Sequence, residues 1–170
     1  MMASLGTIRY GRRDDSLLFH IQGRGVMAHS VPMRQLAEQM LEAGVRRILF
    51  DLRDCTHLDS TFIGTLWTLR RLTEARGLPV PILIAPSLPC IKNLQEMASE
   101  DGFPLGSVSD LPPEPLNWTE LSLEGVDPIA FRRNAIEAHE NLAALEGPER
   151  AKMEAVVRCL QGDPPPPPSS

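Results

Sequence analysis

The sequence has few cysteines and no excess of basic residues, and each shortage argues against a class of protein. Its three cysteines, Cys55, Cys90 and Cys159, are odd in number and far apart, so they suggest no disulfide framework. A formal net charge of -5 at pH 7 argues against a non-specific nucleic-acid binder, which needs a basic surface to displace phosphate counterions. We therefore expect no nucleic-acid partner.

Long apolar runs are also missing. No stretch of the 170 residues is apolar over the length of a membrane span. The first residues, MMASLGTIRYGRR, lack the apolar centre of a secretory signal peptide. These features predict a cytoplasmic protein without a membrane partner, and they leave its oligomeric state, monomer or homodimer, open.

Metal ligands are sparse. Cys55 and His57 stand two residues apart, but nothing nearby completes the four-ligand spacing of a zinc site. We interpret His20, His29 and His139 as structural or surface residues. The sequence therefore predicts no metal site.

Residues 23–28 (GRGVMA) fit G-x-G-x-x-A, the pattern of a dinucleotide-binding loop between a strand and a helix. Ser30 is the expected N-cap, with Pro32 in the first turn, so the helix should begin only after the motif. The first acidic strand end, Asp51, also comes later than the usual ribose-binding carboxylate. We favour a glycine turn over a nucleotide site and expect no cofactor.

With 42% hydrophobic residues the chain can bury a core, and its apolar periodicity alternates between strand and helix. Strands are expected at residues 7–10, 17–21, 48–52, 81–85 and 103–108, and helices between 30 and 44, 60 and 76, and 87 and 98. The first two strands should pair through the turn-like GRRDD. This alternation predicts an α/β fold with a largely parallel or mixed sheet and helices packed on it.

The organisation changes near residue 110. Residues 1–110 form the predicted α/β domain, and the prolines of 111–126 indicate a linker. Residues 127–161 read as a helical hairpin that begins at Asp127-Pro128, and 162–170 as a disordered proline-rich tail. Such a helix pair cannot bury its apolar residues alone, so it must fold back on the domain or meet a partner.

Within residues 50–67, FDLRDCTHLDSTFIGTLW, Ser60 opens a predicted helix. Three interpretations compete: an ordinary helix cap, a catalytic nucleophile, or a site that is itself modified. A catalytic serine needs a base and an oxyanion hole, yet G-x-S-x-G is missing and no spacing here defines a triad. We therefore assign no catalytic residue and do not expect an enzyme.

A helical projection separates two faces of this helix. The core face is apolar: Phe62, Ile63, Leu66, Leu69 and Leu72. The other face carries Ser60, Gly64, Thr68 and Arg71, with Trp67 at the border. Glycine in an exposed helix interior costs about 1 kcal/mol relative to alanine. Gly64 therefore suggests that another surface approaches closely, either a partner or a packed part of the same domain.

Modification of Ser60 has a clear physical consequence. A phosphate at a helix N-terminus faces free backbone N–H groups and the positive end of the helix dipole, so the fold should tolerate it. It would also add up to two negative charges to a surface that already holds Asp54 and Asp59. A partner docked over Gly64 and Trp67 would be repelled.

The same residues resemble the signature of the STAS domain, the fold of bacterial anti-sigma factor antagonists. Asp51 matches its strand-end aspartate, Asp59 the aspartate before the acceptor and Ser60 the phosphorylatable serine. The start of its recognition helix is matched by Thr61, Ile63, Gly64 and Leu66. The likeness spans roughly residues 5–110 and implies a mixed β-sheet flanked by α-helices. The bulky Phe62 and the C-terminal helices depart from the minimal pattern.

The resemblance also implies partner switching. The unmodified protein would bind an anti-sigma factor that is a serine kinase with a histidine-kinase-like ATPase fold, phosphorylation of Ser60 would release it, and a serine phosphatase would restore it. The partner-binding residues would be Asp59, Ser60, Thr61, Gly64, Trp67, Thr68 and Arg71, with Asp51 and Asp59 supporting the acceptor. The alternative is a STAS scaffold or ligand-sensing module that is never phosphorylated.

Overall fold

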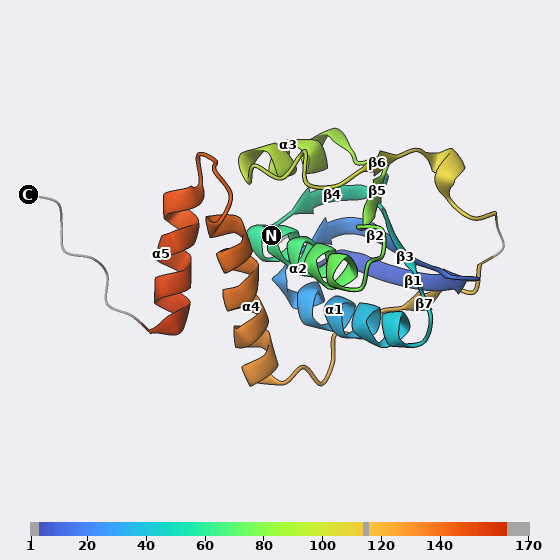
Figure 1. The fold of residues 1–170 in the computed structure, drawn as a ribbon, viewed down its shortest axis with the longest axis horizontal. Coiled ribbons are helices and arrows are strands. Elements are labelled where there is room, and N and C mark those ends of the chain that lie inside the picture. The colour runs from blue at the N-terminus through green and yellow to red at the C-terminus, as the bar shows by residue number, and fades with distance from the viewer. Residues whose placement is uncertain (1–3, 114–115, 163–170) are drawn as a thin grey trace, which may run out of the picture.

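The computed structural model describes residues 4–113 and 116–162, and within them seven strands form one mixed sheet (Figure 1). The predicted tail lies outside the described residues from 163 onward. The strand order is β6-β5-β3-β2-β1-β7, and β4 pairs with β2 off this path. The strands are β1 (Thr7–Arg13), β2 (Ser16–Gly25), β3 (Arg47–Asp51), β4 (Cys55–Leu58), β5 (Ile82–Ile84), β6 (Leu105–Gly106) and β7 (Thr119–Glu120).

Strand directions follow from the connections. β1 and β2 form the predicted antiparallel hairpin, and its turn places Asp14 in the left-handed region with φ of 53°. β3, β4, β5 and β6 run parallel to their neighbours, as expected where a helix or a longer segment crosses between strands, and β7 returns antiparallel along β1. The predicted mixed α/β sheet is confirmed.

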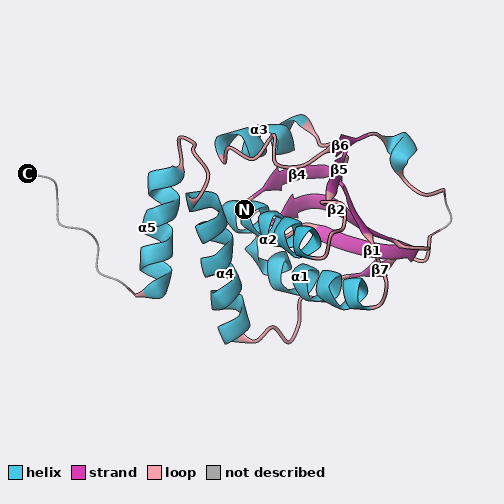
Figure 2. Ribbon diagram, viewed as in Figure 1, coloured by secondary structure: helices cyan, strands magenta, loops and turns pink. Residues whose placement is uncertain are grey.

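Five α-helices accompany the sheet in the described chain (Figure 2). They are α1 (Met27–Glu42), α2 (Ser60–Ala75), α3 (Leu88–Glu96), α4 (Pro128–Ala143) and α5 (Arg150–Gln161). α1 and α2 pack on the sheet, α4 packs on α2, and α5 lies outermost against α4 (Figure 1). The C-terminal helices therefore fold back on the α/β unit.

The core has two parts because the central strands are buried on both faces. The larger part lies under α1 and α2, where Phe19 and Phe50 stack with ring centroids 5.1 Å apart. On the opposite face Leu18, Leu49 and Ile84 are covered by residues that follow the last parallel strand, namely Leu111, Leu116 and Trp118. The nearly all-apolar β3 follows from this two-sided burial.

α1 begins at Met27, so the prediction of Ser30 as its N-cap was wrong, and Pro32 lies inside the helix. The Met27 N–H donates to the Asp59 carboxylate at 2.7 Å, and the imidazole of His29 accepts from the amide before the helix at 3.0 Å. The first turn is thus completed partly by a residue 32 positions away in sequence, which a local pattern cannot reveal.

The glycines of the 23–28 segment have structural roles. Gly23 has φ of +81° and donates its N–H to the Asp54 carbonyl at 2.9 Å, where β2 shifts register against β4. A Cβ on Gly25 would lie 3.0 Å from Leu58 and 3.2 Å from Phe62. These glycines let β2 approach β4 and α2 closely, in keeping with the glycine-turn interpretation.

Two short strands occupy segments that the sequence suggested were irregular. The predicted loop between β3 and α2 contains β4, and the predicted linker contains β7, which pairs through Arg9 and Tyr10 of β1. Both strands are short and mixed in polarity, so their pairing partners and not their own periodicity define them.

Candidate functional site

The site is built around the N-terminus of α2. Asp59 is the N-cap, and its Oδ1 accepts from the Phe62 N–H at 2.8 Å while Oδ2 accepts from the Met27 N–H at 2.7 Å. One carboxylate therefore joins the first turns of α1 and α2. Ser60 is the first helical residue and is half-buried.

The Ser60 hydroxyl contacts a residue from the C-terminal extension. Its Oγ lies 3.1 Å from Nε2 of His139 on α4, and Nδ1 of the same ring lies 2.7 Å from the Ala135 carbonyl oxygen. A carbonyl only accepts, so Nδ1 carries a proton, and in the neutral tautomer that this defines Nε2 accepts the Ser60 O–H. His139 is only 5% exposed. The hydroxyl is therefore held against α4.

A serine bonded to a histidine invites comparison with a nucleophilic pair. Here a neutral carbonyl, that of Ala135, orients His139, whereas a catalytic triad places a carboxylate there to stabilise the imidazolium that forms. The arrangement thus orients the Ser60 oxygen without the charge that activates a serine nucleophile.

Gly64 marks the closest approach of α4 to α2. A Cβ added to Gly64 would lie well inside van der Waals contact with the Ala138 carbonyl. Beside it, the Asn141 side-chain amide donates to the Gly64 carbonyl at 3.0 Å and to the Thr68 hydroxyl at 2.9 Å. The close surface that Gly64 predicted is therefore, in this structure, a helix of the same chain.

The helical projection placed Gly64 and Thr68 on the face of α2 opposite the core, and in the structure α4 covers both. Trp67 points elsewhere, donating its indole N–H to Ser99 at 2.9 Å. Of the predicted partner-binding residues, Thr61, Gly64 and Thr68 are buried, Asp59, Ser60 and Trp67 are partly buried, and Arg71 is exposed.

Asp51 was expected to support the acceptor Ser60, and in the structure it binds Arg53. It ends β3, is 3% exposed, and its carboxylate accepts from the Arg53 guanidinium at 2.8 Å and from the Arg53 backbone at 3.2 Å. The neighbouring Asp54 carboxylate lies 2.9 Å from Nε2 of His20. These bonds fix the loop between β3 and β4.

Hydrogen bonds to the backbone carbonyl of Cys55 hold α3 near this loop. Ser87, the N-cap of α3, donates to the Cys55 carbonyl at 2.6 Å, and Cys90 Sγ lies 3.5 Å from the same oxygen. The hydrogen bond to Cys90, together with burial, raises the pKa of the Cys55 thiol. Neither thiol is accessible in the folded chain.

Reasoning from the sequence missed three residues of α4 that reach α2: Asn134, His139 and Asn141. The sequence did contain an indication of this contact, because His139 stands among apolar residues at helical spacing. Asn134 and Asn141 also stand two helical turns apart on one face. The pattern indicates a polar contact face but not the partner of that face.

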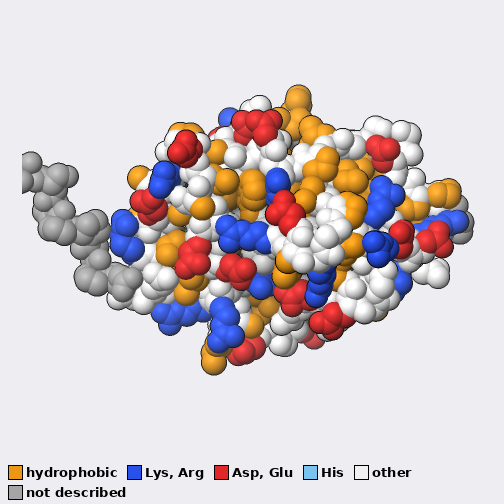
Figure 3. Space-filling view, viewed as in Figure 1, with side chains coloured by type: hydrophobic (Ala, Val, Ile, Leu, Met, Phe, Trp, Pro, Cys, Tyr) orange, Lys and Arg blue, Asp and Glu red, His pale blue; other side chains and the backbone are white. Residues whose placement is uncertain are grey.

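Charged residues indicate no further specialised centre in the described chain. No group of three or more His, Cys, Asp or Glu residues there could hold a metal ion, and no described helix is long and apolar enough to cross a membrane. Acidic and basic side chains are interspersed over the face seen in Figure 3.

Comparisons with known proteins bear on the fold. Neither a protein-family model nor a curated protein matches the sequence. The solved structure of the anti-sigma factor antagonist SpoIIAA, in its unphosphorylated form, matches with a TM-score of 0.54 at 15% identity, covering 61% of this chain and 89% of that one. The chain has the fold of the anti-sigma factor antagonists.

A candidate anti-sigma factor antagonist from Thermotoga maritima gives a similar result. Its structure matches with a TM-score of 0.53 at 16% identity, covering 59% of this chain and 87% of that one. Both matches cover most of the solved structure and leave a substantial part of this chain unmatched. The STAS-like fold expected from the residues around Ser60 is confirmed, and this chain carries the antagonist fold together with additional structure.

Proposed function

We propose that this protein is an anti-sigma factor antagonist that works by partner switching. Unmodified, it binds an anti-sigma factor that is also a serine kinase, and phosphorylation of Ser60 releases that partner. A serine phosphatase then returns the protein to its binding form. The protein is the substrate of this cycle and supplies no catalytic group.

The observation that carries the proposal is the position of Ser60. It is the first residue of α2, in a chain that has the antagonist fold. The helix dipole there favours a phosphate. Phosphorylation replaces the Ser60 O–H that contacts His139 and adds up to two negative charges beside the Asp59 carboxylate. The modification therefore changes the charge and the contacts of the α2 face together.

The first prediction is covalent modification of Ser60. The full chain is incubated with the cognate kinase and ATP, and its mass is measured by mass spectrometry. We expect the mass to increase by about 80 Da, which is one phosphoryl group. Ser60→Ala should abolish the gain, whereas Thr61→Ala, which removes the adjacent hydroxyl, should keep it. A gain that persists in Ser60→Ala would assign the acceptor elsewhere.

Binding measurements separate charge from the loss of the hydroxyl. Ser60→Asp introduces a negative charge and Ser60→Asn a neutral side chain of similar size, so only the former should weaken kinase binding, by about a hundredfold or more if like charges meet at the interface. Equal affinity of the two variants would contradict a charge-based release.

One observation favours the second candidate, an unmodified STAS scaffold or sensing module. Ser60 is half-buried and bonded to His139, so the described conformation holds the hydroxyl instead of presenting it. If Ser60 gains no mass with any kinase encoded beside the gene, this second function is preferred.

A further inference from the structure

We propose that α4 is an intramolecular cover of α2. It occupies the α2 face that the partner binds, and α4 and α5 move away together before a kinase or partner can reach Ser60. This inference rests on the proposed function for the identity of that face. The opening itself is a property of the isolated chain, and it is tested without any partner.

The composition of the covered α2 face is the first observation. Its buried members are small or polar: Thr61, Gly64, Thr65 and Thr68, with Ser60 half-buried at the end. The opposite side of α2 gives its large apolar side chains to the main core: Phe62, Ile63, Leu66 and Leu69. A face of hydroxyls and glycine is compatible with water, so uncovering it exposes none of the large apolar side chains of α2.

The facing side of α4 has the same character. Asn134 donates to the Thr65 hydroxyl at 3.2 Å, and Asn141 and His139 bond α2 as described. Between them lie small side chains, Ala135 and Ala138. Polar groups of this kind exchange their partners for water at a small net cost. The contact therefore resembles a separable interface more than a core.

One buried polar atom between α2 and α4 also lacks a hydrogen bond within the described chain. Asn141 Oδ1 is buried and accepts no hydrogen bond from the residues that the structure describes. A buried acceptor left without a partner is unfavourable, and opening would return it to solvent. The closed state thus carries a penalty at its centre that the open state lacks.

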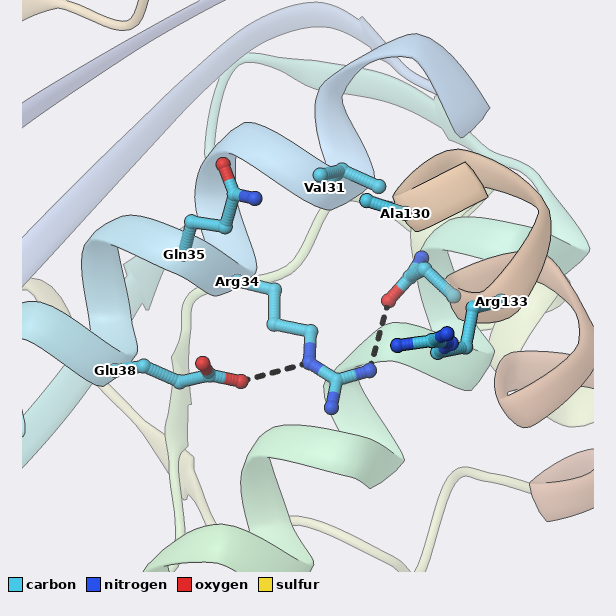
Figure 4. A pocket seen from close by; sticks show the side chains of 7 residues that line it. Val31, Arg34, Gln35, Glu38, Ala130 and Arg133 are labelled. Carbon is cyan, nitrogen blue, oxygen red and sulfur yellow. Dashed lines mark hydrogen bonds and ion pairs between the residues drawn. The ribbon is translucent and has the colours of Figure 1, made fainter. Parts of the chain in front are cut away.

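A cleft of about 240 Å3 lies where α4 meets α1 (Figure 4). Arg34 spans this junction, bonding Glu38 of its own helix at 2.8 Å and reaching Asn134 at 3.2 Å and Glu137 at 2.6 Å on α4. At this point α4 is joined to α1 by hydrogen bonds and ion pairs across the cleft, and not by interlocked apolar side chains. Such interactions break without disturbing α1.

The chain provides a hinge immediately before α4. β7 is fixed to β1, and the next residue, Leu121, is buried and donates its N–H to the Ile8 carbonyl at 2.8 Å. Residues 122–127 are then exposed or half-exposed, and Gly125 has φ of +73° with open space around it. The α4–α5 pair can therefore pivot while the segment up to Leu121 stays in place.

Apolar anchors hold the pair at its far end. Leu142 and Met153 are its two large buried apolar side chains, and they join the edge of the main core near Met97 and Ala98 at the end of α3. Opening must expose these two residues, which keeps the closed state dominant. It exposes far less apolar surface than unfolding the sheet, so it should occur as a separate, lower-energy event.

The cover also indicates what kind of partner fits the face. α4 presents a small residue, Ala138, opposite Gly64, and the side-chain amide of Asn141 reaches the Gly64 carbonyl and the Thr68 hydroxyl beside it. A partner that replaces α4 should therefore present a helix with a small residue at the centre of contact and hydrogen-bond donors beside it. A broad apolar helix face would find no apolar pocket there.

The test compares thiol labelling in two parts of the full chain. Thr68→Cys places a thiol under α4, Cys90 reports the main core, and Cys159→Ser removes the exposed native thiol. Each labelling rate in native buffer is divided by the rate of the same thiol in the unfolded chain. We expect Cys at position 68 to label at least about tenfold faster than Cys90, with a weaker dependence on denaturant.

A matched pair of substitutions addresses the role of α4. Ala138→Glu places a charge against Gly64 and should accelerate labelling at position 68, whereas Ala144→Glu makes the same change at an exposed residue of α4's C-terminal cap and should leave it unchanged. Labelling of position 68 and Cys90 at one rate, with one denaturant dependence, would overturn the proposal.

Hydrogen exchange of the unsubstituted protein provides an independent measurement. Amides of α4 should exchange through an opening that is less sensitive to denaturant than the global unfolding that exposes β3. If amides of α4 and β3 share one opening event, the cover is an integral part of the fold and the proposal fails. Neither measurement needs kinase or partner, so its outcome is independent of whether Ser60 is phosphorylated.

Discussion

At the scale of single residues, Gly64 shows how tertiary contact reverses a local preference. Replacing an exposed helical glycine by alanine normally stabilises a helix by about 1 kcal/mol. Here the added methyl group would meet the Ala138 carbonyl, which is backbone and can move only with α4. We expect Gly64→Ala to lower the free energy of unfolding by about 1–3 kcal/mol, measured by urea denaturation.

A control calibrates the helix-propensity contribution. Ala155 is exposed on α5, so Ala155→Gly should cost about 1 kcal/mol through propensity alone. Stabilisation by Gly64→Ala of a similar size would mean that α4 does not press on α2, and it would contradict the close contact.

At the scale of elements, the starts of α1 and α2 depend on one carboxylate. Asp59 caps α2 through the Phe62 N–H and also satisfies the Met27 N–H that opens α1. Loss of an N-cap costs about 0.5–2 kcal/mol, so Asp59→Ala should destabilise the protein at the upper part of that range.

Asp59→Asn serves as the comparison, because it keeps one acceptor oxygen and should lose less. The measurement is chemical denaturation of both variants beside the wild type. Unchanged stability of Asp59→Ala would show that solvent satisfies both amides, and the two helices would then begin independently.

At the scale of the whole molecule, the sheet with α1 to α3 and the α4–α5 pair should respond differently to one substitution. Helices as short as α4 and α5 are marginal in water when detached. Ala138→Glu should therefore reduce helical circular dichroism at 222 nm, while the fluorescence of Trp67 and Trp118, which both pack on the rest of the chain, keeps a cooperative unfolding transition.

Ala144→Glu is again the matched control and should retain the full helical signal. Simultaneous loss of the helical signal and of the cooperative tryptophan transition in Ala138→Glu would show instead that the sheet cannot fold without α4. That outcome would make the chain one cooperative unit.

Local patterns determined much of this protein. The alternation of strands and helices, the two-sided burial of β3, the cap Asp127 and the apolar core face of α2 could all be predicted, because each depends on residues within a few positions of one another. The cap of α2 was placed one residue too late, at Ser60 instead of Asp59. The placement of Ser60 at the start of α2 follows from the same short-range rules.

Only the tertiary structure decided what lies against that helix. The bond from Ser60 to His139 joins residues 79 positions apart, and the contacts of Asn141 with Gly64 and Thr68 span similar separations. Helical spacing shows that a face is small and polar, but water, a partner and another helix of the same chain can all satisfy such a face. The choice among them depends on how the chain closes on itself, and sequence periodicity carries no information about that closure.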